Sequence, residues 1–175
     1  IGANDVLIRI KKSAICGTDV HIYNWDEWSQ KTVPVPMVTG HEYVGEVIDY
    51  GPGSKRTVKP GRKVTSVPIM RQSGAHAVIG FSHDCPGGFG EYMLLDEDFI
   101  IEIPSDLDDD LAAMTEPLAV GLEHARRGRP TKEDVALVLG CGAIGLGVIA
   151  GLGLMGIAPI VAADFHPQRR ALAIR

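Results

Sequence analysis

The sequence has few cysteines, no excess of positive charge and no uninterrupted hydrophobic run. Its three cysteines, Cys16, Cys85 and Cys141, are too few and too scattered for a disulfide framework, which favours a reducing compartment. A net charge of −5 gives no electrostatic reason to bind nucleic acid or an anionic membrane. Glycines interrupt the apolar stretch 144–160, so a buried helix is expected there and not a membrane span. These absences predict a soluble, cytoplasmic protein.

Two further features are missing at the N-terminus. No secretory signal is visible, and the first residue is Ile1 instead of methionine, which leaves room for a missing N-terminal segment. There is also no internal repeat and no low-complexity tract. Composition alone therefore predicts an ordinary globular chain, and the function has to come from motifs.

Short strands separated by turns dominate roughly the first hundred residues. Residues 6–11 alternate apolar and polar side chains, with Val6, Ile8 and Ile10 on one face, as in a strand with one buried side. Similar strands are expected at residues 43–49, 62–68 and 92–95, with turns rich in glycine and proline between them. This spacing predicts an all-β, barrel-like domain.

The pattern changes to helix beyond these strands. Ser105 is expected to cap a helix with an acidic first turn, because negative charge near a helix N-terminus is favourable. That helix would direct Leu111, Ala112 and Met114 inward. Its aspartates are interpreted as capping and solvated groups and not as a metal site. A second helix is expected at residues 117–127, followed by a hinge.

The segment 135–164 has the order strand, glycine-rich turn, helix, strand, acid. Residues 135–139 are continuously apolar, as expected for a parallel strand buried on both faces. Gly140-Cys141-Gly142-Ala143-Ile144-Gly145 follows at once, and a second strand at 160–163 leads to Asp164. This is the context in which a GxGxxG motif binds a dinucleotide.

Each part of this loop has a predicted task. Gly140 permits the turn, Gly142 lets the backbone approach the pyrophosphate, and Gly145 allows close packing of helix on strand. Asp164 would bind the adenosine ribose and repel a 2′-phosphate, which predicts NAD over NADP, although two arginines at 169–170 keep that preference open. With the helix N-terminus facing the phosphates, the predicted cofactor-binding residues are Gly140, Gly142, Ala143, Ile144, Gly145 and Asp164.

Near the N-terminus, Cys16-Gly17-Thr18-Asp19-Val20-His21 and Gly40-His41-Glu42 concentrate reactive side chains. The thiolate, imidazole and carboxylate of Cys16, His41 and Glu42 are ligand types that hold zinc, and a catalytic site keeps one position open. Alone, the cysteine or the histidine would more simply be a core residue, but together they favour a metal. Thr18 and His21 could carry a proton away from a bound alcohol. A zinc site, a proton path and a nicotinamide site predict an alcohol dehydrogenase.

These motifs together resemble the zinc-dependent medium-chain dehydrogenase/reductase family, in which a GroES-like catalytic domain precedes a Rossmann domain. The matching stretches are the catalytic-zinc signature at 16–21 and 40–45, the linking helices at 106–121 and the cofactor fingerprint at 140–164. The resemblance implies an α+β fold overall. A GroES-like β-barrel catalytic domain with linking helices would span residues 1–127, and the first βαβ unit of a Rossmann α/β domain would span 128–175.

The resemblance also implies roles for the site residues. Cys16 and His41 would ligate the catalytic zinc, and Glu42 would be a third ligand or a carboxylate that moves onto zinc when water exchanges. Glu116 stands where the family places its last protein ligand and would bind directly or through water. Asp19 would orient His41 by a hydrogen bond.

The implied reaction transfers hydride from a secondary alcohol to NAD. In the family, zinc lowers the pKa of the bound alcohol. Thr18 would take the alcohol proton and pass it by way of the cofactor ribose toward His21 and solvent.

The substrate stays open between an L-threonine-like compound and a polyol. Residues 14–48 resemble the L-threonine 3-dehydrogenase branch of the family, Glu116-Pro117-Leu118 the sorbitol and polyol branch, and residues 81–95 a third, actinobacterial-type branch. Three aromatics in the first of these stretches would wall a substrate pocket or pack on the surface: Tyr23, Trp25 and Trp28.

Two features depart from the family. Its structural zinc is commonly held by four closely spaced cysteines, but the corresponding region 68–86 contains only Cys85, so we expect one catalytic zinc and no structural zinc. His76 and His83 are interpreted as loop histidines, with a replacement metal site as the alternative. The chain is also about half the family's length, so an N-terminal fragment or a natural truncation is expected. Its residues 130–175 should be labile, because a lone βαβ unit leaves an open sheet edge.

The expected partner is a small-molecule alcohol, with neither nucleic acid nor membrane, and full-length relatives are expected to be homo-oligomers. The alternative is a truncated, non-catalytic GroES-like zinc-binding module without a complete cofactor site, which cofactor-dependent turnover would exclude. A zinc-free quinone reductase of the same superfamily is disfavoured, because its members lack the set Cys16, His41 and Glu42.

Overall fold

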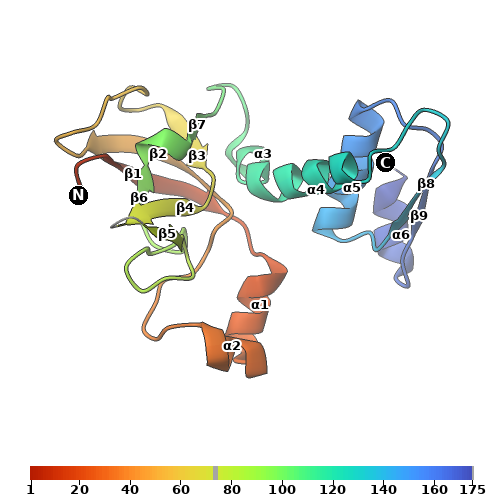
Figure 1. Ribbon diagram of the computed structural model, residues 1–175, viewed down its shortest axis with the longest axis horizontal. Helices are drawn as coiled ribbons and strands as arrows, with labels where there is room; N and C mark the ends of the chain where they lie inside the picture. Colours follow the sequence, from red (N-terminus) through yellow and green to blue (C-terminus); the bar gives the residue numbers. More distant parts are fainter. Residues whose placement is uncertain (73–74, 175) are drawn as a thin grey trace. The chain divides into compact units, whose positions relative to one another are not determined.

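The computed structural model describes residues 1–72 and 75–174 (Figure 1). It divides into two compact units, Ile1–Glu116 and Pro117–Arg175, earlier in the chain than the domain boundary expected after residue 127. The first unit is built on strands and the second on helices with a short parallel sheet.

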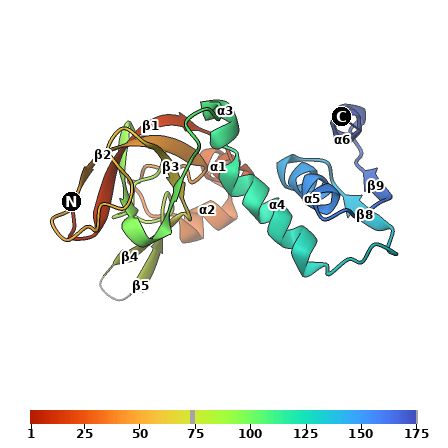
Figure 2. The same ribbon diagram turned by 90° about the horizontal axis from the view of Figure 1, so that it is seen from above.

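The first unit contains a five-stranded antiparallel sheet in the order β6-β1-β2-β3-β7. These strands are β1 (Asp5–Ser13), β2 (Tyr43–Tyr50), β3 (Lys63–Ser66), β6 (Tyr92–Asp96) and β7 (Ile100–Glu102). An antiparallel pair, β4 (Ile69–Gln72) and β5 (Ala75–Val78), lies below this sheet in Figure 2. The four strands expected from the sequence are confirmed as β1, β2, β3 and β6, whereas β7 and the β4–β5 pair were not anticipated.

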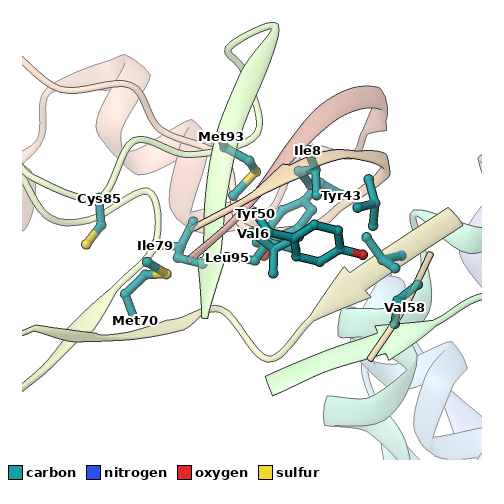
Figure 3. Close-up of a cluster of buried hydrophobic side chains, with 12 residues drawn as sticks. Val6, Ile8, Tyr43, Tyr50, Val58, Met70, Ile79, Cys85, Met93 and Leu95 are labelled. Carbon is teal, nitrogen blue, oxygen red and sulfur yellow. The ribbon is translucent and has the colours of Figure 1, made fainter. Parts of the chain in front are cut away.

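The core of this unit forms on one face of the central strands. Val6 and Ile8 of β1 are fully buried, as their alternation with polar residues predicts. They pack with Tyr43, Val47 and further apolar side chains of the surrounding strands (Figure 3). Burial of this kind is the main stabilising contribution to the unit that carries the metal-ligand candidates.

Two helices occupy the stretch that sequence analysis treated as a turn and an aromatic loop. They are α1 (Gly17–Asn24) and α2 (Glu27–Thr32). Cys16 caps the first and Asp26 the second, where the Asp26 side chain accepts a hydrogen bond from the Ser29 backbone. An acceptor followed three residues later by a second polar side chain is a helix-start signal. Both helices were therefore detectable from Asp19 and Asp26.

The helix expected to begin at Ser105 begins later, and that expectation is wrong in its start and in one inward residue. Helix α3 (Asp109–Ala112) is capped by Asp108, while Ala112 is buried and Leu111 is 61% exposed. The acidic run includes the helix cap, as predicted, and two of its carboxylates form ion pairs that were not predicted: Asp109 with Lys63 and Asp110 with Lys12.

Helix α4 (Thr115–Arg127) starts two residues before the expected position. From Pro117 onward it belongs to the second unit, because its Gly121 and Ala125 pack against α5 (Ala143–Leu154): a Cβ at Gly121 would lie 2.5 Å from the carbonyl carbon of Gly147. The remaining elements are β8 (Ala136–Leu139), β9 (Ile160–Ala163), α6 (Pro167–Ala173) and, in the first unit, the short helix η1 (Glu97–Phe99).

Strands β8 and β9 pair in parallel, with α5 as the crossover, which confirms the predicted βαβ unit. Val138 is buried against Leu152 of α5, whereas Leu137 and Leu139 on the opposite face are 61% and 77% exposed. The strand expected to be buried on both faces is thus covered on one. No helix in the described residues is long and apolar enough to cross a membrane.

Asp96 anchors β6 to β4 and provides a pH-dependent contribution to stability. Its carboxylate accepts hydrogen bonds from Arg71 Nε and Nη2, at 2.9 Å and 3.1 Å, and Arg71 holds the pKa of Asp96 below its usual range. Because the folded pKa is depressed, this contribution is complete above the unfolded pKa of about 3.9 and is lost as the pH falls through the folded pKa.

Asp96→Asn should therefore destabilise the first unit by about 1–2 kcal/mol at pH 7, with the gap from the unaltered chain closing below about pH 4. Urea unfolding followed by tryptophan fluorescence measures this, because Trp25 and Trp28 both lie in the first unit. Asp98→Asn is the control, since Asp98 is a half-exposed partner of the same arginine and should change stability by less than about 1 kcal/mol. A gap that persists unchanged in acid would refute the assignment.

Candidate metal centre

Cys16, His41 and Glu42 come together in the first unit, with one ligand atom of each within 4.8 Å of the others. Cys16 ends the loop after β1, and the other two directly precede β2, so the pairing of β1 with β2 brings them side by side. They are the only group of three or more potential ligands among residues 1–72 and 75–174. The fold thus brings together three of the four predicted ligands.

The surroundings of this cluster suit a cation. His41 Nδ1 is buried and has no hydrogen-bond partner, which leaves a polar atom for a metal or a water. Burial raises the pKa of Glu42, against the opposing influence of His41 and of the Cys16 thiol. A thiol, an orphaned imidazole nitrogen and a buried carboxyl fit zinc by donor type.

Glu116 lies outside the group of three, but the charges of His41 and Glu42 influence its pKa. Burial raises the pKa of Glu116; the charge of His41 opposes this rise and that of Glu42 adds to it. The carboxyl groups of Glu42 and Glu116 therefore share one partly buried environment, and such perturbed groups gather at functional sites.

Asp19 holds the two ligand segments together in a way that sequence analysis did not anticipate. Its Oδ2 accepts a hydrogen bond from Cys16 N at 2.8 Å and its Oδ1 accepts one from Thr39 Oγ1 at 2.7 Å. Both of these partners differ from the expected one, His41, whose buried Nδ1 accepts or donates no hydrogen bond among the described residues. Asp19 thus links the loop that carries Cys16 to Thr39, two residues before His41.

A glycine turn braces the same segment from the other side. Gly87 N donates to Val38 O at 2.7 Å and Gly88 N donates to Gly40 O at 2.8 Å. A Cβ at Gly87 would lie 2.2 Å from Gly40 O, so only glycine allows this backbone approach. The turn expected merely to lead into β6 therefore also fixes the loop that delivers His41.

Thr18 and His21 border a hollow of about 270 Å³ in the first unit, together with Asp26 and Trp28. The Cys16 thiol lies 3.5 Å from Thr18 Oγ1, and His21 Nδ1 lies 2.5 Å from Asp26 Oδ2. The two predicted proton carriers thus share one cavity, which Trp28 also lines. A larger cavity of about 770 Å³ lies beside β4 and β6 and contains none of the predicted site residues.

The second unit carries the predicted dinucleotide loop between β8 and α5. Gly140 has a φ of +97°, and Gly142 is the N-cap of α5, ahead of Ala143 and Ile144 in its first turn. A Cβ at Gly142 would meet no atom within 4 Å, which leaves space in front of the helix N-terminus for a phosphate. A Cβ at Gly145 would lie 1.8 Å from Gly140 O, so this glycine is needed for the predicted close packing.

Asp164 follows β9, and its side chain is hydrogen-bonded to the glycine-rich loop. Its Oδ2 accepts a hydrogen bond from Cys141 N at 2.8 Å and its Oδ1 accepts one from His166 N at 2.8 Å. These backbone hydrogen bonds lower the pKa of Asp164. The group is therefore a carboxylate with remaining acceptor sites for ribose hydroxyls, and it also braces the glycine loop.

Residues 2–105 match the model of the alcohol dehydrogenase GroES-like domain. The chain belongs to this family. The resemblance to medium-chain dehydrogenases is thereby confirmed, including the GroES-like fold of the first unit.

The chain's relatives are dehydrogenases. It is 42% identical to the L-threonine 3-dehydrogenase of Mesorhizobium japonicum, over 99% of this chain and 53% of that protein. It is 41% identical to the L-threonine 3-dehydrogenase of Anaeromyxobacter dehalogenans, over 100% of this chain and 53% of that protein. The chain spans about half the length of the curated relatives it matches.

Solved structures with this fold are also dehydrogenases. The 2R,3R-butanediol dehydrogenase of Bacillus subtilis superposes with a TM-score of 0.82 at 31% identity, over 99% of this chain and 54% of that one. An alcohol dehydrogenase of Escherichia coli CFT073 in complex with NADH superposes with a TM-score of 0.85 at 29% identity, over 99% and 53%.

The histidines near the expected position of a structural zinc join no metal-ligand group in the described residues. His83 Nδ1 lies 3.1 Å from Pro36 O, and the His76 ring packs 6.5 Å from the ring of Phe99. His83 lies in a turn, as expected, whereas His76 lies in strand β5, so the interpretation as a loop histidine is wrong for His76.

Proposed function

We propose that this member of the alcohol dehydrogenase GroES-like family is part of a zinc-dependent enzyme that transfers hydride from a secondary alcohol to NAD. The substrate class is an L-threonine-like or polyol alcohol. The observation that supports this most is the cluster of Cys16, His41 and Glu42, in which one ligand atom of each residue lies within 4.8 Å of the others. We assign residues 1–127 to the catalytic part and residues 128–175 to part of the NAD-binding domain.

In this proposal, Cys16, His41 and Glu42 hold one zinc ion, with Glu116 placed to bind directly or through water. Zinc supplies Lewis acidity, which makes an alcohol hydroxyl easier to deprotonate. Thr18 would accept the hydroxyl proton and pass its own by way of the cofactor ribose toward His21 and solvent, a path supported by the hollow that Thr18 and His21 both line. Asp19 fixes Cys16 and, through Thr39, the segment that carries His41.

The glycine loop of the second unit holds the cofactor in this proposal. Gly142 and the amides of Ala143 and Ile144 face the pyrophosphate, and Asp164 accepts hydrogen bonds from the adenosine ribose. The carboxylate of Asp164 would repel a 2′-phosphate, so NAD is preferred over NADP. The relatives named L-threonine 3-dehydrogenase support the substrate class, as does the polyol-like Glu116-Pro117-Leu118 sequence.

The test measures bound zinc and the formation of NADH at 340 nm with L-threonine, 2,3-butanediol and sorbitol, each with NAD and with NADP. The proposal predicts about one zinc per chain and NAD-dependent turnover of at least one of the alcohols. A well-folded chain with neither bound zinc nor turnover would contradict it. Zinc without turnover would favour the non-catalytic module instead.

A further inference from the structure

The hollow beside Thr18 contains a carboxylate that the proposed function does not use. Asp26 is brought there by the connection between two helices: α1 ends at Asn24, and Trp25 adopts a left-handed conformation with a φ of +50°. The Trp25 backbone N–H donates to the carbonyl groups of the last turn of α1. The chain therefore folds back, and Asp26 faces His21 across this turn.

The two oxygens of Asp26 have different partners. Oδ1 accepts hydrogen bonds from the backbone N and from Oγ of Ser29, both at 2.9 Å, and so caps α2. Oδ2 lies 2.5 Å from His21 Nδ1. The Ser29 backbone hydrogen bond, followed by the hydrogen bond with His21, lowers the pKa of Asp26 to about 2. The carboxylate is thus ionised near neutral pH and can only accept hydrogen bonds.

This arrangement decides which nitrogen of His21 carries the proton. Opposite an acceptor-only carboxylate, Nδ1 must be the donor, so in the neutral ring Nε2 holds the free lone pair. The Trp28 ring packs edge-on against the imidazole, with ring centroids 6.5 Å apart and planes at 71°, which restricts its rotation. The other charged groups of α2, Glu27 and Lys31, pair with each other and leave Asp26 as the charged partner of the ring.

We propose that Asp26 is a positioning residue of the proton path: it fixes the Nδ1–H tautomer of His21 and thereby keeps Nε2 as the proton acceptor. The catalytic consequence of this inference rests on the proposed function. The tautomer of His21 rests on the geometry alone. Nε2 takes one proton from the Thr18 side, the carboxylate stabilises the resulting imidazolium, and the proton then leaves Nε2 to water. The exit is open, because the His21 side chain is 64% exposed.

Asp26→Asn is the decisive variant. Asparagine is as good an N-cap as aspartate, so its carbonyl can still serve Ser29 and the helices should stay folded. Its amide group would then face His21 Nδ1 as a donor, which favours the opposite tautomer, with the proton on Nε2. Nitrogen-15 NMR of the histidine rings, above the ordinary histidine pKa of about 6.5, distinguishes the two forms. His21→Gln assigns the signals by removing them.

The unaltered chain should show the Nδ1–H form at His21, and Asp26→Asn should convert it to the Nε2–H form. Ser29→Ala is the matched control, since it removes a partner of Oδ1 but leaves Oδ2 in place, and it should keep the Nδ1–H form. In kinetics, Asp26→Asn should lower kcat about 10-fold to 100-fold, with KM for the alcohol and zinc content unchanged.

An Nε2–H form in the unaltered chain, or an unchanged tautomer in Asp26→Asn, would overturn the proposal. A full tautomer reversal with wild-type kcat would overturn its catalytic part. Failure of the proposed function would look different: the unaltered chain would lack zinc and NADH formation, and the tautomer measurement, which needs neither, would still decide the role of Asp26.

Discussion

Replacing Cys16 by alanine should release the zinc and abolish alcohol oxidation. The substitution removes the thiolate from a three-residue cluster in which one ligand atom of each residue lies within 4.8 Å of the others. Loss of a group that merely orients a ligand typically lowers metal affinity 10-fold to 100-fold, and loss of a ligand should cost more than about 100-fold. Elemental analysis after gel filtration should fall from about one zinc per chain to a small fraction of that.

Cys141→Ala is the matched control for this variant. Cys141 is buried, whereas Cys16 is half-buried, and Cys141 lies in the second compact unit and in none of the metal-ligand groups of the described residues. It should leave the zinc content unchanged. Full zinc occupancy in Cys16→Ala, with its tryptophan fluorescence unaltered, would place the metal elsewhere and contradict the assignment.

Gly145→Ala should disrupt the second unit and eliminate NAD binding. The new Cβ, whose position the backbone fixes, would lie 1.8 Å from the carbonyl oxygen of Gly140, a backbone atom that cannot rotate away. Overpacking against backbone should cost about 3 kcal/mol or more, a large share of the stability of a small unit. Hydrogen exchange should rise throughout α5 and the β8–β9 pair, and equilibrium dialysis should show no NAD binding.

Gly153→Ala is the control, because Gly153 lies in the same helix and a Cβ there meets nothing within 4 Å. It should stabilise α5 by about 0.5–1 kcal/mol and leave NAD binding unchanged. Tryptophan fluorescence reports on the first unit, because both tryptophans lie in it. The unfolding midpoint measured by this fluorescence should not change in either variant. Normal NAD binding by Gly145→Ala would contradict the packing role of this glycine.

The parts of the fold that sequence reasoning predicted are those with a strong local signal. Alternation gave β1, because Val6 and Ile8 face one core, and the order strand, glycine loop, helix gave the βαβ unit. The late start of α3 was missed because several aspartates in a row could each cap a helix, and only packing of Ala112 selects Asp108. Helices α1 and α2 were missed because their aromatic residues suggested a loop.

At the candidate site, residue types predicted the metal-ligand candidates but not the hydrogen bonds that hold their segments in place. The proximity of Cys16 to His41 depends on the pairing of β1 with β2, which motifs imply only through the family resemblance. The local hydrogen bond from Cys16 N to Asp19 was readable from its three-residue spacing, but the one from Thr39 could not be deduced, since it depends on where two distant loops meet. The opposite holds for Asp26, whose spacing to Ser29 was a readable capping signal.

X-ray absorption at the zinc edge of the purified chain tests the central claim most directly. Coordination by Cys16, His41 and Glu42 predicts one sulfur neighbour at about 2.3 Å, with the remaining neighbours nitrogen or oxygen at about 2.0–2.2 Å. That result would establish a mixed zinc site of the kind on which the proposed alcohol chemistry depends. A spectrum with several sulfur neighbours, or with none, would contradict it.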